Sequence, residues 1–239
     1  MKQIKTIVRM SDQGFSCPFL CIDEEDARWW CKGQLSGTQS QRNEWICAHL
    51  ARHLMLPVPD FEIMQVPDGL FELWQMGHPE CRDVFVLPSN PYVFASRLVP
   101  ECRDLSVNSP FLIRGDRNLQ ARVFAFDWVI RNMDRSDGNS NVLVDVSEAA
   151  IHVIDHNSAF DPDFDKTKFQ ENHVFRGAFQ SLSFEAHAQL EQDIRQSLAT
   201  FDLTAVWDGM PEAWMDEATP GLTFEAIQDT LTARWSPLP

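Results

Sequence analysis

The sequence predicts an α+β protein of two lobes, a β-rich N-terminal lobe with one main helix and a mostly helical C-terminal lobe. The first hundred residues alternate short apolar runs with polar turns, whereas a continuous helical pattern begins near residue 118. The later segments are helical apart from one hairpin. A chain of 239 residues, 44% of them hydrophobic, can bury one large core or two lobes. We therefore expect one domain, with lobes at residues 1–100 and 101–239.

The N-terminal lobe is predicted to contain strands at residues 3–10 and 17–22, separated by the polar turn "SDQGFS". The run "ARWWCKGQ" predicts a third strand that ends at a single lysine, Lys32. Apolar residues at helical spacing in "SQRNEWICAHLARHLML" predict a helix, which must end before "PVP" because proline cannot continue it. Three further strand-like runs follow: "FEIMQV", "GLFELWQM" and "DVFVL".

The C-terminal lobe begins with "NLQARVFAFDWVIRNM", which predicts a long helix with a buried aromatic side. The segment "NVLVDVSEAAIHVIDH" has two apolar runs joined by a short polar link, and this pattern predicts a hairpin. Three surface helices are expected after it, with capping residues Ser183, Thr204 and Thr223.

Charge and composition exclude several classes of protein. The net charge is −15, and residues 155–239 hold 15 of the 35 acids but only 5 of the 20 bases, which argues against nucleic acid or an anionic membrane as partner. No apolar run reaches the roughly eighteen residues of a membrane span, and no leader pattern is present, so we expect a cytoplasmic protein. The cysteines form no CxxC pair and are expected to be reduced thiols: Cys17, Cys21, Cys31, Cys47, Cys81 and Cys102.

Oxygen-bearing side chains are concentrated where the chain enters the predicted hairpin. They are Asp134, Asp137, Asn139 and Asn141, and the second strand of the hairpin leads to Asp155. Because a hairpin holds its ends side by side, Asp134, Asn139 and Asp155 should converge. Asn139 and Asp155 would supply hard oxygen ligands, and Asp134 would orient an attacking hydroxyl, as magnesium-dependent phosphoryl transfer requires.

The spacing of these residues follows the plan of protein kinases, in which the metal-binding asparagine lies five residues after the catalytic aspartate. Asp134 and Asn139 have that interval, and Asn141 is the alternative metal ligand because it lies closer to the strand. Upstream, a strand-end lysine should pair with a glutamate on the next helix to hold the nucleotide phosphates. Lys32 and Glu44 occur in that order.

The phosphate-binding loop is expected in "SDQGFSC", where backbone amides around Gly14 and Ser16 would contact ATP. Structural explanations exist for each separate residue, since Asp and Asn are common turn formers and a lone lysine is often solvated. An EF-hand fits poorly, because a loop starting at Asn132 puts Asp137 where glycine is required and Leu143 where glutamate is required. The order of all the pieces favours a kinase.

Two neighbours of these residues have more ordinary roles in this interpretation. Arg135, directly after the predicted catalytic aspartate, would contact substrate or contribute to packing. His156, directly after Asp155, is expected to be structural. Asp137 is the next candidate for the catalytic acid if Asp134 is not that residue.

The segment "FDWVIRNMDRSDGNSNVLV" with "IHVIDHNSAF" resembles the catalytic core of HipA-like kinases, and also that of type II phosphatidylinositol 4-kinases. "CKGQ", "NEWICAHLARHLMLPVP" and "FASRLVP" resemble the lysine strand, the helix and the hinge approach of compact HipA-like proteins. The resemblance covers roughly residues 5–215 and implies a two-lobed protein-kinase-like fold. It also implies ATP and Mg²⁺ as cofactors, and a partner protein encoded separately is plausible.

Three functions follow from this resemblance. The first is a serine/threonine protein kinase in which Asp134 orients the hydroxyl, Lys32 and Glu44 hold the phosphates, and Asn139 and Asp155 bind the metal. The second is a lipid kinase, which "RNMDR" favours and the acidic charge disfavours. The third is a pseudokinase that binds nucleotide and acts as an interaction module.

Overall fold

The computed structural model describes residues 1–11, 17–32, 37–78, 90–106, 108–145, 150–215, 223–233 and 238–239. The chain divides into two compact units. Unit 1 comprises Met1–Arg42, Pro59–Val99 and Gly209–Pro220, and unit 2 comprises Asn43–Val58, Pro100–Asp208 and Gly221–Pro239. Each unit consists of three separate stretches of chain.

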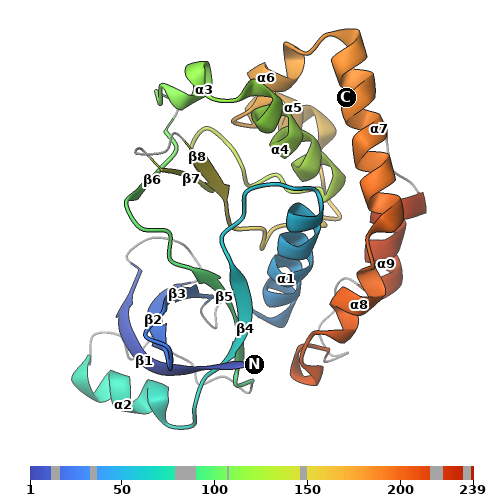
Figure 1. Ribbon diagram of the computed structural model, residues 1–239. Helices are drawn as coiled ribbons and strands as arrows, with labels where there is room; N and C mark the ends of the chain where they lie inside the picture. Colours follow the sequence, from blue (N-terminus) through green and yellow to red (C-terminus); the bar gives the residue numbers. More distant parts are fainter. Residues whose placement is uncertain are drawn as a thin grey trace. The chain divides into compact units, whose positions relative to one another are not determined.

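Unit 1 is built on a closed five-stranded barrel, in the order β1-β2-β3-β5-β4 (Figure 1). The strands are β1 (Lys2–Met10), β2 (Phe19–Asp23), β3 (Arg28–Cys31), β4 (Phe61–Gln65) and β5 (Tyr92–Arg97). Strand β1 pairs antiparallel with β2 and parallel with β4, which closes the barrel. The expected strands at residues 3–10, 17–22 and "ARWWC" are therefore present, as is the strand expected in "FEIMQV".

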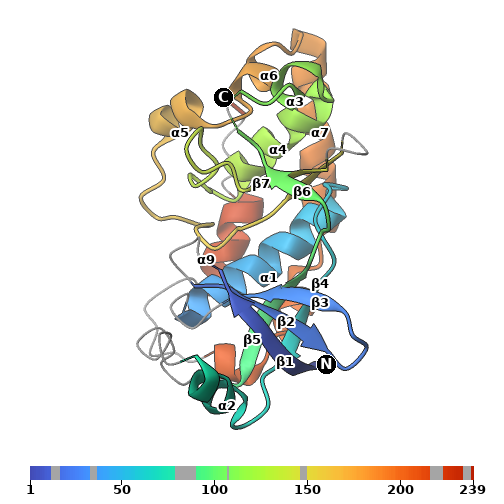
Figure 2. The same cartoon turned by 90° about the vertical axis from the view of Figure 1, so that its left-hand side faces the viewer.

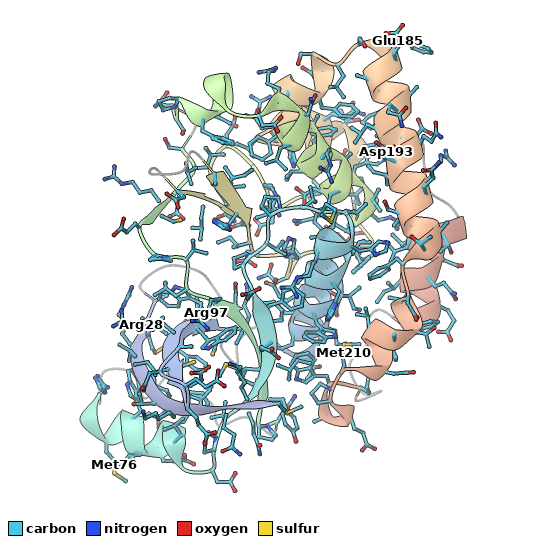
Figure 3. The ribbon with its side chains drawn as sticks, viewed as in Figure 1. Arg28, Met76, Arg97, Glu185, Asp193 and Met210 are labelled. Atoms are coloured by element: carbon cyan, nitrogen blue, oxygen red, sulfur yellow. The ribbon has the colours of Figure 1, made fainter. Side chains whose placement is uncertain are left out.

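One strand prediction in unit 1 was wrong, because "GLFELWQM" forms helix α2 (Leu70–Gly77). Its apolar residues suit a helix as well as a strand, and packing against the barrel stabilises the helix. Phe71 is buried and meets Phe19 edge to face at 5.3 Å, whereas Leu73 and Met76 are exposed. Figure 3 shows Met76 pointing away from the barrel. The expected strand "DVFVL" lies outside the described residues.

The helix expected after the third strand is α1 (Gly37–His53). It begins at Gly37, whose φ of 64° lies in the left-handed region that favours glycine, and it ends before Pro57 and Pro59 as expected. Its unit 2 portion is anchored by Trp45, whose indole nitrogen donates to the Val206 carbonyl at 3.0 Å. Val206 belongs to α8 (Leu203–Asp208).

Unit 2 contains an antiparallel sheet of three strands in the order β6-β7-β8. The predicted hairpin is present as β7 (Val142–Asp145) and β8 (Ala150–Val153), with Val142 opposite Val153. The third strand, β6 (Cys102–Asp104), was not expected and pairs with β7. Helices make up much of the remaining described part of this unit: α3 (Phe111–Arg114), α4 (Arg117–Val129), α5 (Lys166–Asn172), α6 (Arg176–Gln180), α7 (Phe184–Thr200), α8, α9 (Phe224–Gln228) and a π-helical turn at Asp229–Ala233.

Helix α4 is the long helix expected from residue 118, and it forms the centre of unit 2. Asp116 caps its first turn by accepting hydrogen bonds from the backbone nitrogens of Asn118 and Leu119. Residues Gln120 to Val129 are buried except for Arg122, so the helix is covered on nearly all sides rather than on one. Phe124 stacks on Phe179 of α6 at 4.3 Å, and both views show α6 beside α4 (Figure 2).

Two of the three predicted helix caps are confirmed. Ser183 and Thr223 accept hydrogen bonds from backbone nitrogens in the first turns of α7 and α9. Thr204 is not a cap, because α8 begins one residue earlier and Asp202 accepts from the nitrogen of Ala205 at 2.9 Å. Aspartate is at least as good a cap as threonine, and it precedes the helix by one position here.

Among the described residues, no disulfide joins Cys17, Cys21, Cys31, Cys47 or Cys102, and Cys81 lies outside the described residues. Across the part of the chain that is described, none of the helices combines the length and the apolar character that crossing a membrane requires.

The cap of α8 gives a test with a matched control. Replacing Asp202 with alanine should lower the free energy of unfolding by about 1 kcal/mol, because the Ala205 amide loses its partner. Thr204→Ala, two residues further along the chain, should leave stability within about 0.5 kcal/mol. Urea denaturation of the two variants measures the difference, and an equal effect of both substitutions would contradict the observed cap.

Candidate active site

The loop after α4 places the predicted catalytic aspartate. Helix α4 ends at Val129 with Ile130 as its C-cap, and Arg131 adopts a left-handed φ of 52° that turns the chain. Asn132 then binds back to the helix, with its nitrogen donating to the Asp127 carbonyl at 2.9 Å. Its side-chain oxygen accepts from the Asp134 nitrogen at 3.1 Å. The backbone before and at Asp134 is thus fixed by hydrogen bonds.

Both candidate asparagines contact Asp134. The amide nitrogen of Asn139 donates to Asp134 Oδ1 at 2.9 Å, and that of Asn141 donates to Asp134 Oδ2 at 3.2 Å. Asn141 also donates to the Asp134 carbonyl at 2.9 Å. A tight turn between Ser136 and Asn139, closed by two backbone hydrogen bonds, returns the chain to this position. The structure therefore brings together three of the predicted residues, and it places both asparagines beside the carboxylate.

The hairpin brings Asp155 to the same end of the sheet. Beyond the last strand pair, the nitrogen of Ile154 donates to the carbonyl of Asn141 at 3.1 Å, so Asp155 follows directly after a residue bonded to Asn141. Asn141 and Asp155 have φ values of 48° and 58°. Such left-handed backbone is uncommon for residues other than glycine, and Asn and Asp tolerate it better than most.

Helix α1 holds the chain that follows Asp155. Glu44, which is buried, accepts from the His156 nitrogen through Oε2 at 3.0 Å. The side chain of the preceding residue, Asn43, donates to the carbonyls of Asn157 and Ala159, both at 2.9 Å. Sequence reasoning did not identify Asn43, although it stands directly before Glu44 in the same motif.

Arg135 is fully buried, which excludes direct contact with a substrate and leaves the packing role that the sequence also allowed. Its Nε forms an ion pair with Asp127 Oδ2 at 2.6 Å. Its Nη1 donates to the carbonyls of Ser140 at 3.4 Å and Ile154 at 3.2 Å, and also to that of Asn141. One guanidinium therefore contacts α4 and both strand ends of the hairpin.

Asp127 accepts hydrogen bonds from three residues, two in the loop after α4 and one, His173, that is distant in sequence. Besides Arg135, it accepts from the Asn132 amide at 3.1 Å and from His173 Nε2 at 2.9 Å. Burial opposes ionisation of Asp127, but the charge of Arg135 and the hydrogen bond from His173 outweigh it and lower the pKa to about 2. Sequence reasoning missed Asp127, although a lone acid in the apolar helix "VFAFDWVI" is a signal for a buried polar network.

His173 is neutral in this network. Its Nδ1 accepts from the Phe175 nitrogen at 3.1 Å, so the proton must be on Nε2, which faces Asp127. Burial lowers the pKa of His173, and this effect exceeds the opposing effect of Asp127. The ionised pair is therefore Asp127 with Arg135, and His173 supplies a neutral donor.

In unit 1, the predicted phosphate-binding lysine lies at the end of β3. The Lys32 nitrogen donates to the Phe94 carbonyl at 2.9 Å, and the Lys32 carbonyl accepts from Gln41 Nε2 at 3.5 Å. Gln41 in turn accepts from the Phe94 nitrogen at 2.6 Å, so the backbone of Lys32 is bound to β5 and α1. Lys32 belongs to unit 1 and Glu44 to unit 2, and their ion pair stays a prediction. Gly14 and Ser16 lie outside the described residues.

The donor set suits a hard divalent cation. Asn139 and Asn141 turn their amide nitrogens toward Asp134, which directs their amide oxygens away from it, and Asp155 adds a carboxylate at the same end of the hairpin. Oxygen donors of this kind fit Mg²⁺ or Mn²⁺. No cluster of three or more His, Cys, Asp or Glu that could hold a metal occurs among the described residues, and a site that includes asparagine does not require one.

The fold is similar to that of a solved kinase. A crystal structure of the Golgi casein kinase matches with a TM-score of 0.51 at 14% identity, covering 97% of this chain and 70% of that chain. A second structure of the same kinase, with Mn/ADP bound, matches with the same score and identity, covering 97% and 71%. The Helicobacter pylori proinflammatory kinase CtkA matches with a TM-score of 0.49 at 12% identity, covering 98% and 94%.

The family follows from the sequence. The model of the HipA-like kinase family matches residues 4–236, and the chain therefore belongs to this family. The resemblance recognised in the loop and hairpin motifs is confirmed over nearly the whole chain. No curated protein sequence matches significantly.

The buried histidine gives a pH-dependent prediction. Because the pKa of His173 is lowered in the folded state, its contribution to stability should be complete above the ordinary histidine pKa of 6.5 and should be lost as the pH falls below it. We expect His173→Gln to destabilise the protein more at pH 7.5 than at pH 5. Urea midpoints at the two pH values measure this, with His53→Gln as a control at an exposed histidine. An equal loss at both pH values would contradict a neutral buried His173.

Proposed function

We propose that this chain is an ATP- and magnesium-dependent kinase that transfers the γ-phosphoryl group to a serine or threonine hydroxyl of a protein. The arrangement of Asp134 between Asn139 and Asn141, at the hairpin end that leads to Asp155, carries the proposal. Membership of the HipA-like kinase family supports it. A kinase with a similar fold has been crystallised with Mn/ADP bound, which supports the use of a nucleotide and a divalent metal here.

Asp134 has the properties of a residue that orients the acceptor hydroxyl. Hydrogen bonds from Asn139 and Asn141 reach different carboxylate oxygens, at 2.9 and 3.2 Å, so the carboxylate plane is fixed before a substrate arrives. Each carboxylate oxygen can accept more than one hydrogen bond, and Asp134 can therefore still receive the hydroxyl. A preorganised carboxylate of this kind positions the nucleophile and accepts its proton.

The remaining roles follow the kinase plan. Asp155 with Asn139, or with Asn141 as the alternative, would hold the metal. Lys32 and Glu44, with the backbone around Gly14 and Ser16, would hold the nucleotide phosphates. When bound, the metal–nucleotide complex supplies the phosphoryl group and offsets its negative charge.

The acceptor is proposed to be a protein because the net charge of −15 disfavours polyanionic partners such as nucleic acid and anionic lipid surfaces. A separately encoded partner protein is part of the same proposal, as is a cytoplasmic location. Transfer to a protein substrate but not to phosphoinositide vesicles would separate this function from that of a lipid kinase.

Asp134→Asn tests the catalytic assignment. The substitution keeps the size of the side chain, so stability should change by no more than about 1 kcal/mol. Phosphoryl transfer should fall by about 10²–10⁴-fold, because a positioned general base is lost, while ATP binding changes little. The matched control is Asp137→Asn in the same loop, which removes an exposed ion pair with Arg176 and should leave the transfer rate nearly unchanged. Autophosphorylation and ATP titration measure these effects. If Asp134→Asn stays active, the catalytic assignment is wrong and Asp137 becomes the next candidate.

Nucleotide binding is tested by thermal unfolding. Saturating ATP with Mg²⁺ should raise the melting temperature, because a ligand that binds only the folded state stabilises it. Asp155→Ala should lose most of the magnesium-dependent part of this shift, whereas Asp163→Ala, an exposed acid in the same region, should keep it. A melting temperature that Mg-ATP does not change in the wild-type protein would count against the whole nucleotide site.

A further inference from the structure

The guanidinium of Arg135 is the physical link between the loop that carries the candidate catalytic residues and the segment that carries Asp155. A fully buried arginine is costly unless its charge is paired and its donors are satisfied. Here Nε and Nη2 face the Asp127 carboxylate, at 2.6 and 3.4 Å. The third nitrogen, Nη1, faces carbonyls on both sides of the hairpin.

Those carbonyls belong to a candidate metal ligand, Asn141, or to residues directly beside the candidate ligands. Nη1 contacts the carbonyl of Asn141, and it contacts Ile154, whose carbonyl is part of the peptide bond to Asp155, at 3.2 Å. The regular pairing of the two strands ends at Val142 and Val153. Beyond that pair, the hydrogen bond from Ile154 to Asn141 and the contacts of Arg135 join the two chain segments. Arg135 therefore acts where the sheet itself no longer fixes their separation.

The anchor of Arg135 is equally specific. Asp127 lies within the buried helix α4, and His173 and Asn132 bind its two carboxylate oxygens from other segments. The planar fork of arginine can contact a carboxylate with one edge and carbonyls with its remaining nitrogen, whereas the single ammonium of lysine cannot do both. The chemistry required at this position is therefore that of arginine and not only of positive charge.

We propose that Arg135 is a positioning residue for the divalent cation. Through the carbonyls of Asn141 and Ile154 it sets the separation of the asparagine and aspartate ligands, and through Asp127 and His173 it fixes that separation to α4. This proposal rests on the proposed function, because it assigns the metal to Asn139 or Asn141 with Asp155. It adds that metal affinity depends on buried residues that touch neither metal nor substrate.

The test measures metal binding apart from catalysis. Mn²⁺ is titrated into the wild-type protein and Arg135→Lys at saturating ADP, and bound Mn²⁺ is measured by electron paramagnetic resonance. Arg135→Lys should weaken Mn²⁺ binding at least tenfold, while ADP binding measured without metal stays within threefold of wild type. In activity assays, the metal concentration for half-maximal rate should rise more than the rate at saturating metal falls.

A control separates positioning from loss of stability. Leu198→Ala removes a buried side chain from α7 in the same unit and should lower the urea midpoint without changing Mn²⁺ affinity. His173→Gln keeps a donor for Asp127 but loses the imidazole, so it should weaken Mn²⁺ binding severalfold while Arg135 is retained. If Arg135→Lys fails to fold, His173→Gln decides the question.

A double-mutant cycle completes the test. If Arg135 acts through Asp155, Arg135→Lys should weaken Mn²⁺ binding much less in an Asp155→Asn background than in the wild-type protein. Unchanged Mn²⁺ affinity in folded Arg135→Lys, or in His173→Gln where the first variant does not fold, would overturn the positioning role and leave the proposed kinase function standing. A wild-type protein that binds neither Mn²⁺ nor ADP would overturn both.

Discussion

The arrangement of the candidate active site depends on one buried ion pair, that between Arg135 and Asp127. Two opposite charges with fully buried side chains are stable only when further hydrogen bonds satisfy their remaining donors and acceptors. Asn132 and His173 donate hydrogen bonds to the Asp127 carboxylate. Backbone carbonyls of the loop and the hairpin accept hydrogen bonds from the Arg135 guanidinium. Satisfying the pair therefore requires the loop, the hairpin and α4 to take the positions that the site needs. The geometry of the loop and the hairpin is therefore set by the need to satisfy two charges that are removed from water.

Hydrogen bonds hold the backbone on both sides of Asp155. The carbonyl before it is bound by Arg135, and the nitrogen after it donates to Glu44 of α1. The left-handed φ of Asp155 is maintained because its neighbours on both sides are fixed.

The sequence predicted the features that arise from local pattern. Turn formers before an apolar run located the loop, and two short apolar runs located the hairpin. From this geometry we expected Asp134, Asn139 and Asp155 to converge, and the structure shows Asn139 and also Asn141 in contact with Asp134. The errors have physical causes. The apolar residues of α2 suit either a strand or a helix, namely Leu70, Phe71 and Trp74. Contact with the barrel favours the helix. At α8, Asp202 and Thr204 are both good capping residues. The helix begins at Leu203, so Asp202 is the one that caps it.

The residues that sequence reasoning missed share a different property, because their roles exist only after distant segments meet. His173 and Asn43 look ordinary in sequence, since a loop histidine and a helical asparagine each have many structural uses. Asp127 stands out as a lone acid in an apolar helix, but the sequence does not show which residues it contacts. Arg135 was noticed, but its role was open between substrate contact and packing until its complete burial excluded the first. The candidate residues Asp134, Asn139 and Asn141 are thus close together in sequence and can be recognised there. The contacts that fix their positions come from distant segments, which a single sequence does not reveal.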